Sequence, residues 1–107
     1  MSTYKAVFSD IDGTLLTSEH IVSTATIEAI ASLQDKNIPF VIISSRSASC
    51  IYPILEKHHF QCPIVACGGA WIEDMNGRIL SNEGMSKQTA ATVIEFMTEK
   101  KFDLAWG

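Results

Sequence analysis

The sequence lacks the long apolar runs that would let a helix cross a lipid bilayer. Its uninterrupted apolar stretches are only a few residues long, whereas a membrane-spanning helix needs about 20. The N-terminus also lacks the charged segment followed by an apolar one that marks a secretory signal peptide. We therefore expect a cytoplasmic protein that has no membrane partner.

Cysteine is also scarce. The chain has three cysteines, Cys50, Cys62 and Cys67, and an odd number without a secretory signal favours reduced thiols over a disulfide framework. We expect them to be small apolar core residues. A zinc site that combines the last two with His58 and His59 is disfavoured, because the spacing matches no standard finger. A solvated helix end explains the two histidines better.

Positive charge is in deficit, with eight basic against twelve acidic residues and a net charge of −4. No basic stripe with interleaved aromatic residues appears, which argues against a nucleic-acid partner. Apolar residues make up 47% of the chain and charged residues 19%, with no low-complexity tract, so a folded protein is expected. A length of 107 residues suits a single small core.

The most informative stretch is an apolar run that ends in Asp10, Asp12, Gly13 and Thr14. Side chains two residues apart in an extended segment point the same way, so the two carboxylates could face one site. Such a pair repels unless a cation lies between them or one holds a proton. The first arrangement makes a magnesium site, and the second places a general acid beside a nucleophile. An ordinary strand followed by an Asp-Gly turn is the alternative.

Periodicity predicts an α/β chain in which strands and helices alternate. The expected elements are a strand at 4–9, a helix at 24–36 capped by Ser23 or Thr24, a strand at 38–43, a helix at 47–58 interrupted by Pro53, and a strand at 61–66. The continuous apolar run at 38–43 is typical of a parallel strand that is covered on both faces. Strand, helix and strand in this order imply a right-handed crossover.

The last third of the chain predicts a hairpin, a helix and a strand. Asn76-Gly77 between strand-like runs at 71–74 and 78–80 is a strong hairpin signal. Ser86 is expected to cap a helix that runs to about residue 101. Its apolar face should consist of Ala90, Val93, Ile94 and Met97. Residues 102–106 predict one more strand.

A second polar motif, Ser44-Ser45-Arg46, follows the strand at 38–43. Open α/β sheets bind ligands at the carboxyl ends of their strands, where a hydroxyl can donate to a phosphate oxygen. The alternative is that Ser45 or Ser47 simply caps the next helix.

The complete pattern of an apolar strand followed by Asp-x-Asp-Gly-Thr-Leu-Leu resembles the first motif of the haloacid dehalogenase superfamily of phosphohydrolases. The resemblance implies that Asp10 attacks phosphorus to form an aspartyl-phosphate. It implies that Asp12 protonates the leaving group and later activates water. It also implies a Mg²⁺ ion held by the Asp10 carboxylate and the Asp12 backbone carbonyl.

The second motif resembles the Thr-Gly-Arg of the Cof-type phosphatase branch, with Ser44 as the phosphate-binding hydroxyl and Arg46 as the arginine. Ser45 replaces the usual glycine. Together with the loop at Gly13 and Thr14, these residues are implied to bind the substrate phosphate. Residues 67–72 resemble the Asn-Gly-Ala segment that leads to the cap of Cof-type proteins, with a glycine in place of the asparagine.

By this resemblance, residues 1–70 form the N-terminal part of a Rossmann-like core with a parallel sheet. Residues 71–107 begin an α/β cap. The family's third-motif lysine and fourth-motif acidic loop have no match here, and Lys36, Lys57 and Lys87 are expected at the surface. Three explanations are open: a fragment of a longer protein, which we favour, a truncated form that needs a partner chain, or a degenerate member kept for binding.

Two functions follow from the resemblance. The first is a magnesium-dependent phosphatase that acts on small phosphorylated metabolites such as sugar phosphates. The alternative is a non-catalytic module that binds phosphate or metal, or serves assembly, and retains the early motifs. In an incomplete core the first strand is an exposed apolar edge, so a homodimer that covers it is also expected.

Overall fold

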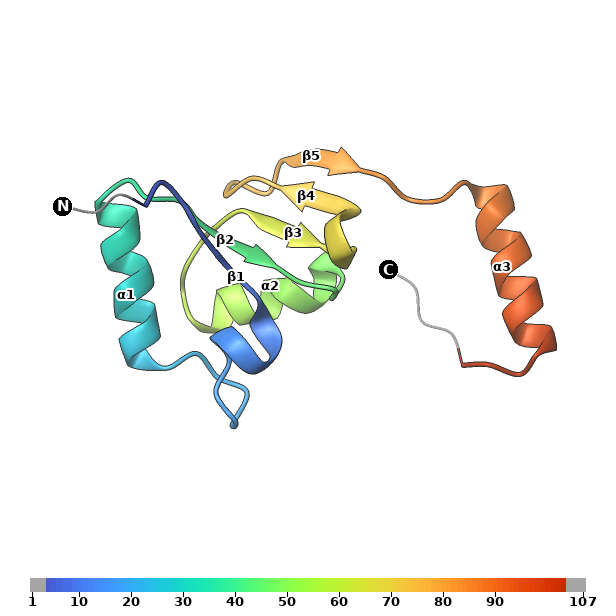
Figure 1. Cartoon of the computed structure of the whole chain (residues 1–107), viewed down its shortest axis with the longest axis horizontal. Helices are drawn as coiled ribbons and strands as arrows, with labels where there is room; N and C mark the ends of the chain where they lie inside the picture. The colour runs from blue at the N-terminus through green and yellow to red at the C-terminus, as the bar shows by residue number, and fades with distance from the viewer. Residues whose placement is uncertain (1–3, 104–107) are drawn as a thin grey trace.

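The computed structural model describes residues 4–103, which form one five-stranded sheet with three α-helices (Figure 1). The strands lie in the order β1-β2-β3-β4-β5 across the sheet. Their bounds are β1 Val7–Ser9, β2 Phe40–Ile43, β3 Ile64–Ala66, β4 Trp71–Glu73 and β5 Ile79–Asn82. The helices are α1 Thr24–Asp35, α2 Ala48–Lys57 and α3 Lys87–Glu99. The fold class is therefore α/β, as predicted.

The first three strands are parallel and are joined by α1 and α2, which confirms the predicted Rossmann-like half. Strands β2 and β3 begin later than predicted, directly after Pro39 and Pro63. Proline has no N–H to donate to a ladder, but its carbonyl still accepts. Val7 donates to the Pro39 carbonyl at 2.8 Å, and Ile42 donates to the Pro63 carbonyl at 3.1 Å.

The predicted hairpin forms, and it extends the same sheet. Strand β4 pairs antiparallel with β3, and β5 pairs antiparallel with β4, so the sheet is mixed. At the turn, Asp74 Oδ1 accepts from the backbone N–H groups of Asn76 and Arg78, each at 2.9 Å. Gly77 has φ 81°, a conformation that favours glycine. The division into a core to residue 70 and a cap from residue 71 stays a prediction.

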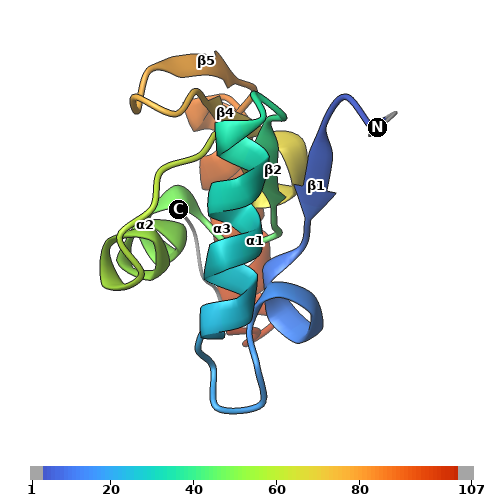
Figure 2. The same ribbon diagram turned by 90° about the vertical axis from the view of Figure 1, so that its left-hand side faces the viewer.

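The core lies between the sheet and the two helices α1 and α2, which cover the same face (Figure 2). Its fully buried side chains are Ile11, Ile42, Ile51 and Ile64. Because side chains alternate along a strand, Phe8 and Ile43 point to the opposite face. They are 61% and 39% exposed, and no described helix covers that face.

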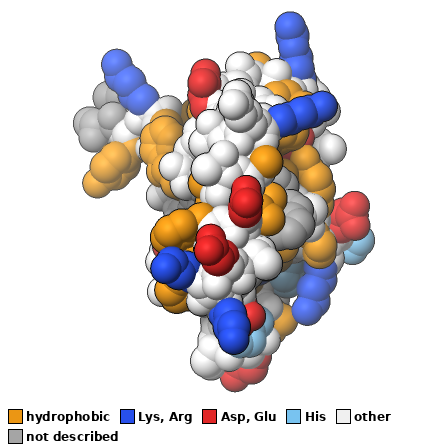
Figure 3. Space-filling model, turned by 90° about the vertical axis from the view of Figure 1, so that its right-hand side faces the viewer, with side chains coloured by type: hydrophobic (Ala, Val, Ile, Leu, Met, Phe, Trp, Pro, Cys, Tyr) orange, Lys and Arg blue, Asp and Glu red, His pale blue; other side chains and the backbone are white. Residues whose placement is uncertain are grey.

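Helix α3 lies apart from the sheet at the far end of the chain (Figure 1). Its cap is the predicted one, since Ser86 Oγ accepts from Thr89 N at 3.1 Å. Its apolar face is not packed against the core: Val93 and Ile94 on this face are 41% and 37% exposed. Figure 3 views the molecule from the side on which α3 lies, and the surface there carries apolar side chains among acidic and basic ones.

The strand predicted at 102–106 falls largely outside the described residues. Phe102 and Asp103 are described and are not in a strand. Within residues 4–103, no helix is long and apolar enough to cross a membrane.

Candidate active site

Parallel pairing brings the two polar motifs to one edge of the sheet. Ser9, the last residue of β1, is the partner of Ile42 in β2. Asp10 and Ser44 therefore both lie just beyond the carboxyl ends of neighbouring strands. The loop after β3 reaches the same edge, because Gly68 N donates to the Ser44 carbonyl at 3.0 Å. This is the edge at which open α/β sheets bind ligands.

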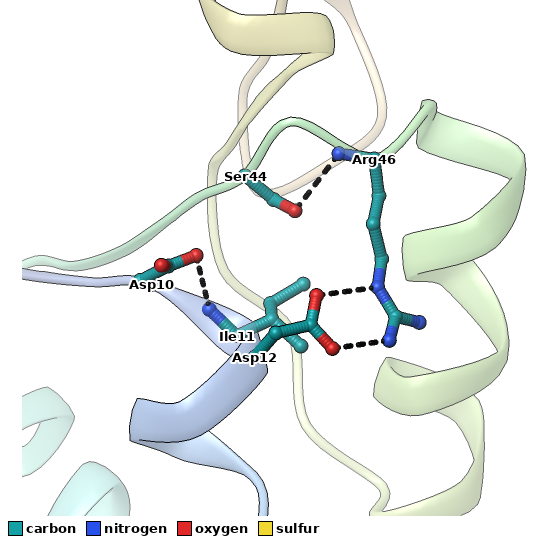
Figure 4. Close-up of polar contacts among 5 residues, drawn as sticks. All are labelled: Asp10, Ile11, Asp12, Ser44 and Arg46. Carbon is teal, nitrogen blue, oxygen red and sulfur yellow. Dashed lines mark hydrogen bonds and ion pairs between the residues drawn. The ribbon is translucent and has the colours of Figure 1, made fainter.

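Asp10 is held by the start of the turn that follows it. Its Oδ1 accepts from the backbone N–H of Ile11 at 2.7 Å (Figure 4). Buried Ile11 and Leu15 anchor this turn to the core, while the chain between them stays exposed. Gly13 has φ 75°, which confirms the predicted sharp turn. The second carboxylate oxygen of Asp10 accepts no hydrogen bond from the described residues and is available to a ligand or a cation.

Asp12 forms a bidentate ion pair with Arg46. Arg46 Nε lies 2.9 Å from Asp12 Oδ2, and one terminal nitrogen lies 2.5 Å from Oδ1. The guanidinium group lowers the pKa of Asp12, and the carboxylate raises the pKa of Arg46. The cation beside Asp12 is therefore an arginine from the second motif, whereas Asp10 lines the cavity without Asp12. Because 34 residues separate the partners, local sequence reasoning missed this contact.

Ser44 is buried, with 3% of its surface exposed. Its Oγ accepts from the backbone N–H of Arg46 at 3.0 Å, which leaves the hydroxyl hydrogen to donate elsewhere. Ser47 is the N-cap residue of α2, as the helix-cap alternative predicted, although its side chain makes no capping hydrogen bond; Ser44 lies before the cap. Ser44 thus points a donor at the edge where Asp10 lies.

A cavity of about 470 Å³ lies at this edge, a size that suits a small ligand. Its lining residues are Phe8, Ser9, Asp10, Ile43, Ser44, Ser45, Val65, Gly68 and Gly69. The two glycines come from the segment after β3 and were not predicted as site residues. Asp12 and Arg46 are absent from this lining.

Gly13 and Thr14 are exposed in the turn after β1. They also lie outside the lining of the cavity. Their role in binding phosphate stays a prediction.

A second cavity, of about 500 Å³, lies between α2 and the hairpin turn. Tyr52 and Glu73 line it, and it shares no residue with the cavity beside Asp10. The tyrosine hydroxyl contacts the buried Glu73 carboxylate at 2.7 and 2.6 Å from its two oxygens. None of the predicted site residues lies there.

The cysteine and histidine predictions are partly wrong. Cys62 is buried, and burial raises its pKa to about 11, but Cys50 and Cys67 are exposed. His58 is half-buried rather than solvated, and its Nε2 accepts from Val22 N at 3.3 Å. Burial lowers the pKa of His58. This contact ties the end of α2 to the segment before α1.

The residues at the strand ends fit one part of a magnesium site. Mg²⁺ prefers oxygen ligands and usually takes one or two carboxylates, with water and phosphate completing the shell. The free oxygen of Asp10 and the backbone carbonyl of Asp12 are donors of this kind. Among the described residues, no group of three His, Cys, Asp or Glu side chains is positioned to hold a metal.

The chain matches a known hydrolase family. The family model of haloacid dehalogenase-like hydrolases matches residues 7–107. The chain therefore belongs to this family, as the sequence motifs predicted.

Individual relatives agree with this assignment. The chain is 47% identical over 73 residues to a Haemophilus influenzae protein named as a candidate phosphatase, covering 68% of the chain and 28% of that protein. It is 26% identical over 98 residues to the pyridoxal phosphate phosphatase YbhA of Escherichia coli, covering 91% and 36%. A solved haloacid dehalogenase-like hydrolase from B. subtilis matches with a TM-score of 0.85 at 28% identity, covering 91% and 34%. The chain thus spans about a third of the length of the proteins it matches.

Proposed function

We propose that this chain carries the nucleophile half of a magnesium-dependent phosphatase that acts on small phosphorylated metabolites. The observation that carries the proposal is the cavity at the strand ends, which Asp10 and buried Ser44 line together. A carboxylate beside a hydroxyl donor suits attack on a bound phosphate. The phosphatase names of the relatives support the same reaction class.

In the proposed reaction, the free carboxylate oxygen of Asp10 forms a bond to phosphorus. The bond between phosphorus and the leaving oxygen breaks, and Asp12 gives that oxygen a proton. Water then attacks phosphorus, Asp12 takes a proton from it, and Asp10 is released with inorganic phosphate. Asp12 must take up a proton from water before the first transfer, and its ion pair with Arg46 loosens when it does, because a carboxylate that accepts two charged hydrogen bonds has a lowered pKa and is ionised.

Ser44 donates its hydroxyl hydrogen to a phosphate oxygen, while the turn at Gly13 and Thr14 supplies backbone N–H groups. A Mg²⁺ ion bound at Asp10 and the Asp12 carbonyl would neutralise charge on the phosphate. No lysine lines the cavity. Among the described residues, none that lines this cavity supplies the charge stabilisation that a lysine gives in the family.

The test is magnesium-dependent hydrolysis of an aryl phosphate by the 107-residue chain. Asp10→Asn should abolish turnover, whereas Asp35→Asn, an exposed aspartate at the end of α1, should leave it unchanged. Equal turnover in wild type and Asp10→Asn would contradict the proposal. Phosphate binding without turnover would instead favour the non-catalytic module.

A further inference from the structure

We propose that Arg46 is a positioning residue for Asp12 and not a ligand of the substrate phosphate. This inference rests on the proposed function, because it assigns Arg46 to the acid/base residue of that reaction. It departs from the role that the Cof-type resemblance implies for this arginine. Three observations carry it.

The first observation is how the guanidinium group is used. Nε and one terminal nitrogen of Arg46 bind the two oxygens of Asp12, at 2.9 and 2.5 Å (Figure 4). This parallel arrangement matches the planar fork of arginine to the planar carboxylate and fixes the angle between them. One of the two edges at which the guanidinium can bind two oxygens at once is therefore already occupied by Asp12.

The second observation is where the pair lies. Asp10 and Ser44 line the cavity at the strand ends, whereas Asp12 and Arg46 do not. The Asp12 carboxylate and the Arg46 guanidinium lie on the side toward α2 in Figure 4. A phosphate seated between Asp10 and Ser44 would meet the serine hydroxyl before it met the arginine.

The third observation is that the backbone is anchored at both ends of the pair. The Arg46 N–H donates to Ser44 Oγ at 3.0 Å, and its carbonyl accepts from Cys67 N at 2.8 Å. Asp12 follows Ile11, which is fully buried. Exposed ion pairs are usually weak because two long side chains must be ordered. Anchored backbones reduce that cost, so the pair can hold Asp12 in one orientation.

The chain has only two arginines, Arg46 and Arg78, so its arginine Nε–H NMR spectrum contains two signals. Arg78 lies in the exposed hairpin and provides an internal reference. We expect the Arg46 signal to exchange with water more slowly than the Arg78 signal. Asp12→Ala should remove this difference, and Asp35→Ala should not. Equal exchange of the two signals in the wild-type chain would overturn the inference.

The second arm uses inorganic phosphate as the probe. As phosphate is added, we expect the backbone N–H signal of Ser44 to move while the Arg46 Nε–H signal stays in place. Arg46→Ala should bind phosphate within about twofold of wild type, whereas loss of a direct charged ligand would weaken binding about tenfold or more. A tenfold loss, or an Arg46 signal that moves together with Ser44, would overturn the positioning role.

The two arms separate the inference from the proposed function. If phosphate moves no signal at Asp10 or Ser44, the proposed phosphate site is wrong and the role of Arg46 in it is wrong as well. If phosphate binds but the Arg46 signal does not depend on Asp12, only the positioning role is wrong.

Discussion

Arg46 and Asp12 lie 34 residues apart in the sequence, yet the arginine Nε is 2.9 Å from the aspartate Oδ2. This contact joins the loop after β1 to the loop after β2. It links the two motifs that the sequence showed separately, and it does so beside the cavity that Asp10 and Ser44 line. The candidate site is therefore a set of connected loops and not two independent motifs.

Tyr52→Phe should destabilise the protein. The tyrosine hydroxyl contacts both carboxylate oxygens of Glu73, which is only 5% exposed. Without the hydroxyl, a buried carboxylate loses its donor, so the free energy of unfolding should fall by about 1–3 kcal/mol. Urea unfolding measures the change, and the conservative Glu56→Gln on exposed α2 surface is the control. Unchanged stability would mean that Glu73 does not depend on this contact.

The same pair should make stability depend on pH at the alkaline end. The hydrogen bond to Glu73 raises the pKa of Tyr52 from 10.0 to about 12. Because the folded-state pKa lies above the unfolded one, this stabilisation is fully present below pH 10 and is lost as the pH rises toward 12. Phenolate absorbance should show one late-titrating tyrosine, which Tyr52→Phe removes. A late transition that survives in this variant would refute the assignment.

Ile42→Ala should destabilise the protein far more than Ile79→Ala. Ile42 in β2, which has a neighbouring strand on each side, is 0% exposed, whereas Ile79 in β5 is 51% exposed. Truncating a fully buried isoleucine costs about 2–5 kcal/mol, while the exposed position should change stability by about 0.5 kcal/mol or less. Chemical denaturation of the two variants measures both. Similar losses would mean that the core is not where the structure places it.

We propose that the 107-residue chain forms a homodimer through β1 and the uncovered face beside it. Strand β1 is an edge strand, and Phe8 on it is 61% exposed beside Ile43. Two copies of the same apolar face can pack symmetrically and pair their edges. Analytical ultracentrifugation should show a dimer that Phe8→Lys dissociates and Phe102→Lys, also at an exposed phenylalanine, does not. A monomer at all concentrations would contradict the proposal.

Much of the fold could be predicted from local patterns. Several predicted features depend only on residues that are close together in the sequence. They are the apolar run of β2, the helix caps at Ser23 and Ser86, and the turn at Asn76-Gly77. The strands predicted at 4–9, 38–43 and 61–66 all begin later in the structure. For the second and third, the cause is Pro39 and Pro63, which have no N–H to donate to the ladder.

The remaining features depend on contacts between distant residues. Neighbouring residues in the sequence do not predict three of these features: the ion pair of Arg46 with Asp12, the hydrogen bond between His58 and Val22, and the exposure of Cys50. The roles of Asp10, Ser44 and the turn at Gly13 stay predictions, because geometry shows where they lie but not what they bind.

The most direct test of the central claim is to trap a phosphoryl group on Asp10. The chain is mixed with an aryl phosphate and Mg²⁺, quenched in acid and measured by intact-protein and peptide mass spectrometry. The account predicts one added phosphoryl group on the peptide that contains Asp10, absent in Asp10→Asn and retained in Asp35→Asn. A phosphoryl group on another residue, or release of phosphate by the Asp10→Asn chain at the wild-type rate, would contradict it.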